Sequence, residues 1–441
     1  MQAAARPLAV VVLAGGEGKR LGRDGPKVLA EICGTPSLGH VLAAAGALAP
    51  ARTFVVACHA KEQVADYLRS WPEVEWVDQG ETRGTGHAVL AARKRLGRLE
   101  GDVLVLFGDG PLVRSETLAA LLAEHRERGD ACTLAAARLA EPKGYGRIVR
   151  AADGTLERVV EERDADPPTR RIQEVHCGLA VFRATDLFAA LSAVKTDNAA
   201  TEYYLTDAYR IVRESGERVH LWPLAASEEA LGFNTPAELL ECRRLMRRRI
   251  LERHLKAGVE IEDPDSVHID DDVAIGKGTR ILPFVVIRGG VKIGRGCEVG
   301  PFTHLRAGSV LEDGAEVGNF VEVKKSRLGR GVKAKHLTYL GDATVGRDAN
   351  VGAGTITANF DGRAKHATKI GARAFIGSGT VLIAPVSIGA GAVTGAGAVV
   401  TRGRNVPPGA TVVGVPARPQ AKAARTDGSK RERRARRETK R

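Results

Sequence analysis

A glycine-rich turn near the N-terminus has the residue types that phosphate chemistry needs. The segment LAGGEGKRLGRDGPK runs from Leu13 to Lys27 and includes Arg20. Backbone N–H groups of such a turn can surround a triphosphate, and Arg and Lys side chains can neutralise a leaving pyrophosphate. It is not a Walker A loop, because Arg20 follows the lysine where Ser or Thr is required, and Leu21 excludes the dinucleotide fingerprint. Taken alone, the segment fits a plain strand-to-helix turn about equally well.

The turn follows the first of three short apolar runs, Leu8–Ala14, Thr53–Ala57 and Asp102–Phe107. Helical patterns lie between and after them, at residues 40–48, 61–68, 86–96 and 116–125. This alternation predicts a Rossmann-like α/β domain with a mostly parallel sheet. Ligands in such sheets bind beyond the carboxyl ends of the strands, which is where the glycine-rich turn and the GDG sequence at Asp109 stand.

The second half of the chain has a period of six. Every sixth position from Ile269 is aliphatic, at Ile269, Ile275, Ile281, Ile287, Ile293, Val299, Leu305, Leu311, Val317 and Val323. The pattern slips by one residue before Leu328 and Val345 and is interrupted by an insertion near residues 358–369. Such hexapeptide repeats predict a left-handed parallel β-helix, whose coils bury aliphatic side chains by stacking on one another. The 51 glycines and the 4% aromatic content agree with this architecture.

Between the halves, Thr235-Pro236-Ala237-Glu238 is a capping box that predicts a connector helix. We therefore expect an α/β domain at 1–234, a connector at 235–258, a β-helix at 259–419 and a tail at 420–441. The arginines and lysines from Arg243 to Lys256 are interpreted as the solvated face of the connector helix.

Charge and cysteine content limit the remaining possibilities. The net charge is +13, but residues 420–441 contain ten Lys and Arg against three acidic residues, which predicts a disordered basic tail. RNA binding by this tail is the less favoured alternative. Six dispersed cysteines, no signal-peptide pattern and no long apolar run predict a reduced, cytoplasmic protein without a membrane span.

Ordered motifs in the first half resemble sugar-nucleotide pyrophosphorylases, and in particular the uridylyltransferases that use N-acetylglucosamine 1-phosphate. The motifs are LAGGEGKRL, PKVL, GTGHA, FGDGPL, GYGRI, VE at Val160, IQE at Ile172, EYYLTD and GFN. The resemblance implies UTP as co-substrate and Mg²⁺ held by Asp109 and Asn234. It implies that Arg20 and Lys27 neutralise the negative charge of the leaving pyrophosphate during catalysis. It also implies nucleotide contacts from Leu13, Gly15, Gly16, Gln79, Gly84 and Thr85, and amino-sugar contacts from Gly146, Glu161, His176 and Asn234.

The motifs of the second half resemble the glucosamine-1-phosphate acetyltransferase part of the same bifunctional bacterial family. They are LRAG, GNFVEVKK, KHLTYLGD and GAGTITANFDG. An amine that attacks a thioester must lose a proton, and the resemblance makes His336 the base, positioned by Glu322. It implies acetyl-coenzyme A as co-substrate, a homotrimer, and sugar-phosphate contacts from Arg306, Lys324, Tyr339, Asn350, Asn359 and Lys365. Coenzyme A contacts are expected from Ala353, Ser378, Ala396 and Arg418.

The chain departs from the family pattern at Phe107, His176, Phe360 and Gly414. Two alternatives therefore stay open beside the bifunctional enzyme. The first is a uridylyltransferase whose β-helix is inactive or acetylates another amino-sugar phosphate, such as galactosamine 1-phosphate. The second is a non-catalytic assembly subunit, which the joint presence of Arg20, Lys27, Asp109, Asn234 and His336 disfavours.

Overall fold

The apolar runs of the first half form neighbouring strands of one sheet in the computed structural model, which describes residues 6–22, 24–97 and 100–420. The strand order is β11-β7-β10-β6-β1-β4-β5, with β8 attached to β10 and β9 attached to β8. β6, β1, β4 and β5 run parallel, and β10 is antiparallel to both of its neighbours. The nine strands are β1 (Leu8–Leu13), β4 (Arg52–Ala57), β5 (Val74–Asp78), β6 (Asp102–Phe107), β7 (Cys132–Arg138), β8 (Gly146–Arg150), β9 (Leu156–Val160), β10 (Glu174–Arg183) and β11 (Val219–Pro223).

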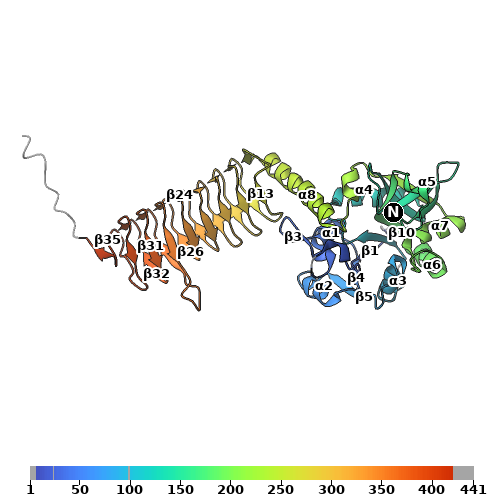
Figure 1. Cartoon of the computed structure of the whole chain (residues 1–441), viewed down its shortest axis with the longest axis horizontal. Coiled ribbons are helices and arrows are strands. Elements are labelled where there is room, and N and C mark those ends of the chain that lie inside the picture. The colour runs from blue at the N-terminus through green and yellow to red at the C-terminus, as the bar shows by residue number, and fades with distance from the viewer. Residues whose placement is uncertain (1–5, 23, 98–99, 421–441) are drawn as a thin grey trace, which may run out of the picture. The chain divides into compact units, whose positions relative to one another are not determined.

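Helices cover both faces of this sheet (Figure 1). They are α1 (Ser37–Gly46), α2 (Lys61–Leu68), α3 (Thr85–Leu96), α4 (Ser115–Arg128), α5 (Pro167–Arg170), α6 (Ala184–Ala193), α7 (Leu205–Glu214) and α8 (Pro236–Lys256). Side chains of α3, α6 and α7 pack with Ala9 and Val11 on one face, and those of α1, α2 and α4 pack with Val10 and Val12 on the other. β1 is therefore buried on both sides, as its continuous apolar run predicts.

Short 3-10 helices and one small hairpin complete this part of the chain. The 3-10 helices are η1 (Lys19–Leu21), η2 (Lys27–Leu29) and η3 (Ser227–Ala230), and the hairpin pairs β2 (Glu31–Ile32) with β3 (Thr35–Pro36). The glycine-rich turn thus leads into η1, a single 3-10 turn.

The hexapeptide repeats form three parallel sheets, which are the faces of the predicted β-helix (Figure 1). The first face has β12 (Glu260–Ile261), β15 (Arg280–Ile281), β18 (Glu298–Val299), β21 (Glu316–Asn319), β24 (Lys333–His336), β27 (Asn350–Val351), β30 (Phe375–Ile376), β33 (Val393–Thr394), β35 (Thr411–Val413) and, antiparallel at its end, β36 (Arg418–Pro419). The second has β13 (His268–Ile269), β16 (Val286–Ile287), β19 (His304–Leu305), β22 (Glu322–Lys324), β25 (Tyr339–Gly341), β28 (Ile356–Ala358), β31 (Val381–Ile383) and β34 (Val399–Val400). The third has β14 (Ala274–Ile275), β17 (Lys292–Ile293), β20 (Val310–Leu311), β23 (Arg327–Leu328), β26 (Ala343–Val345), β29 (Thr368–Ile370) and β32 (Val386–Ile388).

The aliphatic positions of the repeat point into the coils. All ten are buried except Ile275, which is half-buried. Val299 pairs with Val317, 18 residues on, whereas Val317 pairs with Ala334, 17 residues on, so the slips in the sequence are short coils. The insertion leaves the coil after β28 and returns at β29.

The chain divides into two compact units between Arg249 and Ile250, within α8. We refer to them as the N-terminal and C-terminal units. No helix of the described residues has the length and apolar character needed to cross a membrane. The basic tail predicted at the C-terminus lies, from residue 421 on, outside the described residues.

Candidate active sites

A cavity of about 800 Å³ lies in the N-terminal unit where β1, β5 and β6 end. Leu13 and Phe107 are the last residues of β1 and β6, and Gln79 directly follows β5. The structure brings together here every residue that the sequence suggested for uridylyl transfer. The cavity lining includes Leu13, Gly15, Gly16, Arg20, Lys27, Gln79, Gly84, Thr85, Asp109, Gly146, Glu161, His176 and Asn234.

The glycine-rich turn folds closely over Lys27. A Cβ atom on Gly16 would lie 3.0 Å from Lys27 Cε, and one on Gly18 would lie 2.8 Å from Lys27 Cβ. Gly18 also has a φ of 67°, a conformation that favours glycine. The turn therefore needs glycines to let the lysine side chain pass into the cavity.

The ammonium group of Lys27 contacts the two residues that are predicted to hold a metal. It donates a hydrogen bond to Asn234 Oδ1 at 3.0 Å and forms an ion pair with the Asp109 carboxylate. The Lys27 and Asp109 side chains are only 14% and 17% exposed. The oxygen atoms of Asp109 and Asn234 thus converge on one cationic position.

This donor set fits Mg²⁺. The ion prefers carboxylate and other oxygen ligands, and it commonly binds through one or two protein ligands, with substrate phosphates and water completing the shell. The described residues contain no group of three or more His, Cys, Asp or Glu side chains suited to a metal. A metal held by Asp109 and Asn234 would therefore depend on oxygen atoms from the substrate.

Both residues are held by local backbone contacts. Asp109 lies in the turn after β6, where the Gly110 N–H donates to Phe107 O at 3.2 Å. At the start of α8, Glu238 accepts from the Asn234 and Thr235 N–H groups, at 2.5 and 3.1 Å. The Glu238 N–H donates to Thr235 Oγ1 at 3.3 Å, which confirms the predicted capping box.

Gln79 and Gly84, the predicted uracil contacts, line one end of the cavity. The buried Gln79 donates from Nε2 to Gly84 O at 3.1 Å. Gly84 has a φ of 101°, and a Cβ atom there would lie 2.5 Å from Tyr203 O. No larger residue fits this position without moving the backbone that leads into α3.

The other end of the cavity contains Gly146, Glu161 and His176. Glu161 accepts a hydrogen bond from Thr206 Oγ1 at 2.9 Å, and burial raises the pKa of its carboxyl group. A Cβ atom on Gly146 would lie 3.8 Å from both Glu161 Oε2 and His176 Cβ, so these residues surround one point. Thr206 belongs to the EYYLTD motif, but no feature of that motif predicts this contact.

In the C-terminal unit, three predicted phosphate ligands form a cationic cluster. The nearby Lys365 ammonium, with a smaller contribution from Arg306, lowers the pKa of Lys324. Two neighbouring lysines together with an arginine favour an anionic ligand. Gly341 pairs with Lys324 of this cluster on the adjacent coil. A Cβ atom on Gly341 would lie 2.7 Å from Asn359 Nδ2 and would also meet the Tyr339 hydroxyl, so Asn359 and Tyr339 lie beside the cluster.

Glu322 contacts Arg306, whose Nη1 donates to Glu322 Oε1 at 2.8 Å. No hydrogen bond joins Glu322 to His336 among the described residues of the single chain. The two lie on adjacent coils but in different faces, on β22 and β24. Their pairing stays a prediction.

His336 occupies one corner of the β-helix, in register with Asn319 on the coil before it. Three of the predicted coenzyme A contacts occupy the same corner on later coils. Ala334, two residues before His336, pairs with Val351, two residues before Ala353. Gly379 N–H then donates to Ala353 O at 2.7 Å and Gly397 N–H to Ser378 O at 2.8 Å. Ala353, Ser378 and Ala396 therefore form a column along the edge that His336 occupies. Asn350, on β27, and Arg418, on β36, make no described contact with the other predicted acyl-site residues.

Comparisons with known proteins agree with this two-part arrangement. Residues 10–202 match the MobA-like NTP transferase domain family, and residues 272–307 and 367–402 match the bacterial transferase hexapeptide family of six repeats. The bifunctional protein GlmU of Thermobifida fusca is 40% identical over 448 residues, which cover 93% of this chain and 92% of that protein. GlmU of Streptococcus suis is 40% identical over 410 residues, 86% of this chain and 89% of that protein. The chain belongs to the bifunctional GlmU family.

Two departures from the GlmU pattern meet at the wall of the cavity. The Phe107 and His176 rings contact edge to face, with centroids 6.1 Å apart and an interplanar angle of 84°. His176 Nε2 is 2.8 Å from the Tyr209 hydroxyl, and the Tyr209 ring stacks on Phe182 at 5.4 Å. Burial lowers the pKa of His176 to about 4, so the imidazole is neutral at pH 7. Tyr209, which no sequence argument singled out, fixes the orientation of this ring.

One expectation from the sequence is wrong. Arg249 was assigned to the solvated face of the connector helix, but its side chain is only 16% exposed and contacts Leu112 O and Glu228. Met246 and Ile250 are buried on the same helix, three residues before and one residue after Arg249. This spacing was the only signal in the sequence that Arg249 faces the protein.

Proposed function

We propose that this GlmU-family protein acetylates glucosamine 1-phosphate with acetyl-coenzyme A and then transfers UMP from UTP to N-acetylglucosamine 1-phosphate. The products of the second step are UDP-N-acetylglucosamine and pyrophosphate. Residues 1–234 carry uridylyl transfer and residues 259–419 carry acetyl transfer. The observation that supports this most strongly is the single cavity that all the uridylyl-site residues of the family motifs line.

In the uridylyl half, the protein positions and neutralises phosphate groups. Gln79 and Gly84 bind uracil, and Gly146, Glu161 and His176 hold the amino sugar. Arg20 and Lys27 neutralise the pyrophosphate that leaves when the sugar phosphate attacks the α-phosphorus in line. Asp109 and Asn234 hold Mg²⁺, which supplies further positive charge to the phosphates when bound.

In the acetyl half, a base must take a proton from the amine as it attacks the thioester. His336 has this role, and Arg306, Lys324 and Lys365 bind the sugar phosphate beside it. Tyr339, Asn350 and Asn359 contact the sugar or acetyl group, and Ala353, Ser378, Ala396 and Arg418 bind coenzyme A. The column from His336 to Ala396 supports this assignment, because it runs along one edge of the coils.

We further propose a homotrimer formed through the β-helix. Phe284, Phe302 and Phe320 stack on successive coils, with ring centroids 4.8 and 5.0 Å apart. Each ring residue is at least 45% exposed, and each has a positive φ, which is costly for a bulky side chain. Leu337, next to His336, continues the ridge, and this residue is 63% exposed. Packing of this ridge against a second copy would enclose His336 between subunits.

We place the reaction in the cytoplasm, because all six cysteines, which lie within the described residues, are free thiols.

One assay tests the proposal. The purified protein is given glucosamine 1-phosphate, acetyl-coenzyme A, UTP and Mg²⁺, and free coenzyme A, pyrophosphate and UDP-sugar are measured together. With glucosamine 1-phosphate limiting, the proposal predicts equal amounts of all three products once the reaction is complete. Galactosamine 1-phosphate is the comparison substrate, and its preferential use, or UDP-sugar formation only from pre-acetylated substrate, would contradict it.

A further inference from the structure

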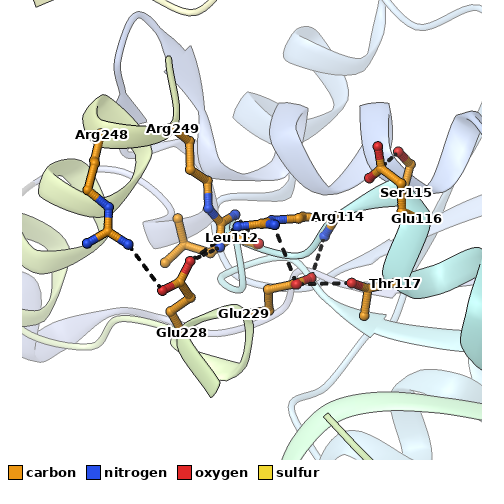
Figure 2. A network of polar contacts seen from close by, with 9 residues as sticks. All are labelled: Leu112, Arg114, Ser115, Glu116, Thr117, Glu228, Glu229, Arg248 and Arg249. Carbon is orange, nitrogen blue, oxygen red and sulfur yellow. Dashed lines mark hydrogen bonds and ion pairs between the residues drawn. The ribbon is translucent and has the colours of Figure 1, made fainter. Parts of the chain in front are cut away.

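A network of charged residues fixes both segments that carry the proposed metal ligands (Figure 2). One segment is the turn after β6, from Asp109 to Arg114. The other runs from η3 to Asn234. Gly232 lies close to Asp109, since a Cβ atom on Gly232 would be 3.1 Å from Asp109 O. The two segments are therefore neighbours along their length, with the proposed metal ligands at one end.

At the far end, Glu229 joins them. This carboxylate is almost fully buried and accepts from the Arg114 N–H at 2.9 Å and from the Thr117 hydroxyl at 3.0 Å. It thereby fixes the end of the Asp109 turn and the start of α4 against η3. A buried carboxylate with these partners is costly to displace.

Arg249 joins the same segments from α8. Its Nη1 donates to Leu112 O, three residues after Asp109, and its Nη2 donates to Glu228 Oε1 at 3.1 Å. Leu112 is fully buried, and Glu228 lies six residues before Asn234. One planar guanidinium thus spans the Asp109 turn and the segment that leads to Asn234. Figure 2 shows the Arg249 side chain reaching toward Leu112 and Glu228.

The neighbouring Arg248 provides a natural comparison. It approaches the same Glu228 carboxylate, at 3.6 Å, but its side chain is 62% exposed and it makes no described contact with Leu112. Arg114 also reaches Glu228, at 3.3 Å, with a side chain that is 46% exposed. Of these three described arginines, Arg249 has the side chain that is best shielded from solvent, at 16% exposed.

We propose that Arg249 is a positioning residue for uridylyl transfer: it fixes the Asp109 turn relative to the segment before Asn234, so that the two side-chain oxygens converge on one cation. This inference rests on the proposed function of the N-terminal unit. Lysine cannot replace the arginine, because a single ammonium lacks the rigid planar fork that reaches the Leu112 carbonyl and the Glu228 carboxylate together.

The test compares Arg249→Lys with Arg248→Lys in the full-length protein. The first measurement is hydrogen exchange of the metal-free protein, followed at the amides of residues 110–114 and 228–232. Arg249→Lys should raise their exchange rates about tenfold or more, whereas Arg248→Lys should leave them unchanged. This measurement needs no metal and no activity.

The second measurement is uridylyl transfer. Arg249→Lys should lower kcat by about 10²-fold, because small displacements of groups around the reacting phosphate are costly, and raise the Mg²⁺ concentration that gives half-maximal rate. The KM for N-acetylglucosamine 1-phosphate should change much less. Acetyl transfer is the internal control and should be unchanged in both variants.

Glu228→Gln removes the charged acceptor and keeps the side-chain size. It should shift exchange and kcat in the same direction as Arg249→Lys by a smaller factor, so the proposal stays testable if Arg249→Lys folds poorly. Exchange rates and kcat in Arg249→Lys equal to those in Arg248→Lys would overturn the proposal, as would an equal loss of both activities. If the wild-type protein forms no UDP-sugar, the proposed function fails, while the exchange comparison still decides whether Arg249 fixes the two segments.

Discussion

Lys27 donates a hydrogen bond to Asn234, 207 residues later in the chain, and the same ammonium pairs with Asp109. The contact brings three residues from the glycine-rich segment, the GDG turn and the start of α8 to one point. A cation is already accommodated there by one carboxylate and one amide oxygen. Metal binding by these oxygens would release Lys27 toward the phosphates, where the proposed function needs it.

Asp109→Ala should lower uridylyl transfer by about 10²–10³-fold, because several kcal/mol of charge stabilisation at the phosphates depend on the metal that Asp109 holds. Acetyl transfer should be nearly unchanged. Initial rates of pyrophosphate and coenzyme A release from the same preparation measure both effects. Loss of both activities in a folded Asp109→Ala protein would show that the two sites are not independent.

His336→Ala should lower acetyl transfer by ~10²–10⁴-fold, the usual cost of losing a general base. Coenzyme A binding and uridylyl transfer should be retained. His268→Ala, on the first coil of the β-helix, is the control and should acetylate at the wild-type rate. An unchanged acetylation rate in His336→Ala means that another group accepts the proton.

His176 predicts a pH dependence of stability. Its native pKa is about 4 because the ring is buried, whereas the ordinary value is 6.5. Between these values the unfolded chain binds a proton that the native state does not, so this stabilising contribution is complete above pH 6.5 and is lost as the pH falls to 4. The unfolding free energy of the wild type should therefore fall by about 3 kcal/mol more than that of His176→Asn over this range.

Tryptophan fluorescence can measure this difference in urea titrations. The chain has three tryptophans, Trp71, Trp76 and Trp222, and all lie in the N-terminal unit, so the signal reports the unit that contains His176. If the unfolding free energies of wild type and His176→Asn fall equally from pH 7 to pH 4, the His176 ring is not held neutral in the native state.

The proposed trimer predicts the effect of Phe302→Asn. Asparagine tolerates the positive φ at this position, so the variant removes the aromatic ring without adding backbone strain. Sedimentation should report three chains for the wild type and fewer for Phe302→Asn. The variant should lose acetyl transfer and keep uridylyl transfer, and a fully active wild-type monomer would refute the model.

Periodic features of this fold could be predicted from the sequence, because aliphatic residues at a regular spacing mark the positions that are buried. The aliphatic residue at every sixth position placed the β-helix coils, and the slip before Leu328 appears as a short coil in which Leu311 pairs with Leu328. The glycine-rich turn and the GDG turn could be placed at the cavity because they follow the ends of β1 and β6, whereas the other lining residues were assigned by the family resemblance.

Contacts that depend on tertiary packing were not predictable. Arg249 lies in an arginine-rich helix whose composition indicates a solvated face, and only the fold brings Leu112 and Glu228 to it. The Arg306 contact with Glu322 likewise depends on how neighbouring coils stack. The pairing of Glu322 with His336 was suggested by resemblance, and the single chain leaves it untested.

The central claim is that two separate sites act in series, and a mixing experiment tests it most directly. Asp109→Ala and His336→Ala are incubated with glucosamine 1-phosphate, acetyl-coenzyme A, UTP and Mg²⁺, first separately and then together, and the sugar products are identified by mass spectrometry. Asp109→Ala alone should accumulate N-acetylglucosamine 1-phosphate, His336→Ala alone should form little product, and the mixture should form UDP-N-acetylglucosamine. A mixture that forms no UDP-N-acetylglucosamine, although each variant is folded and the wild type is active, would contradict the account.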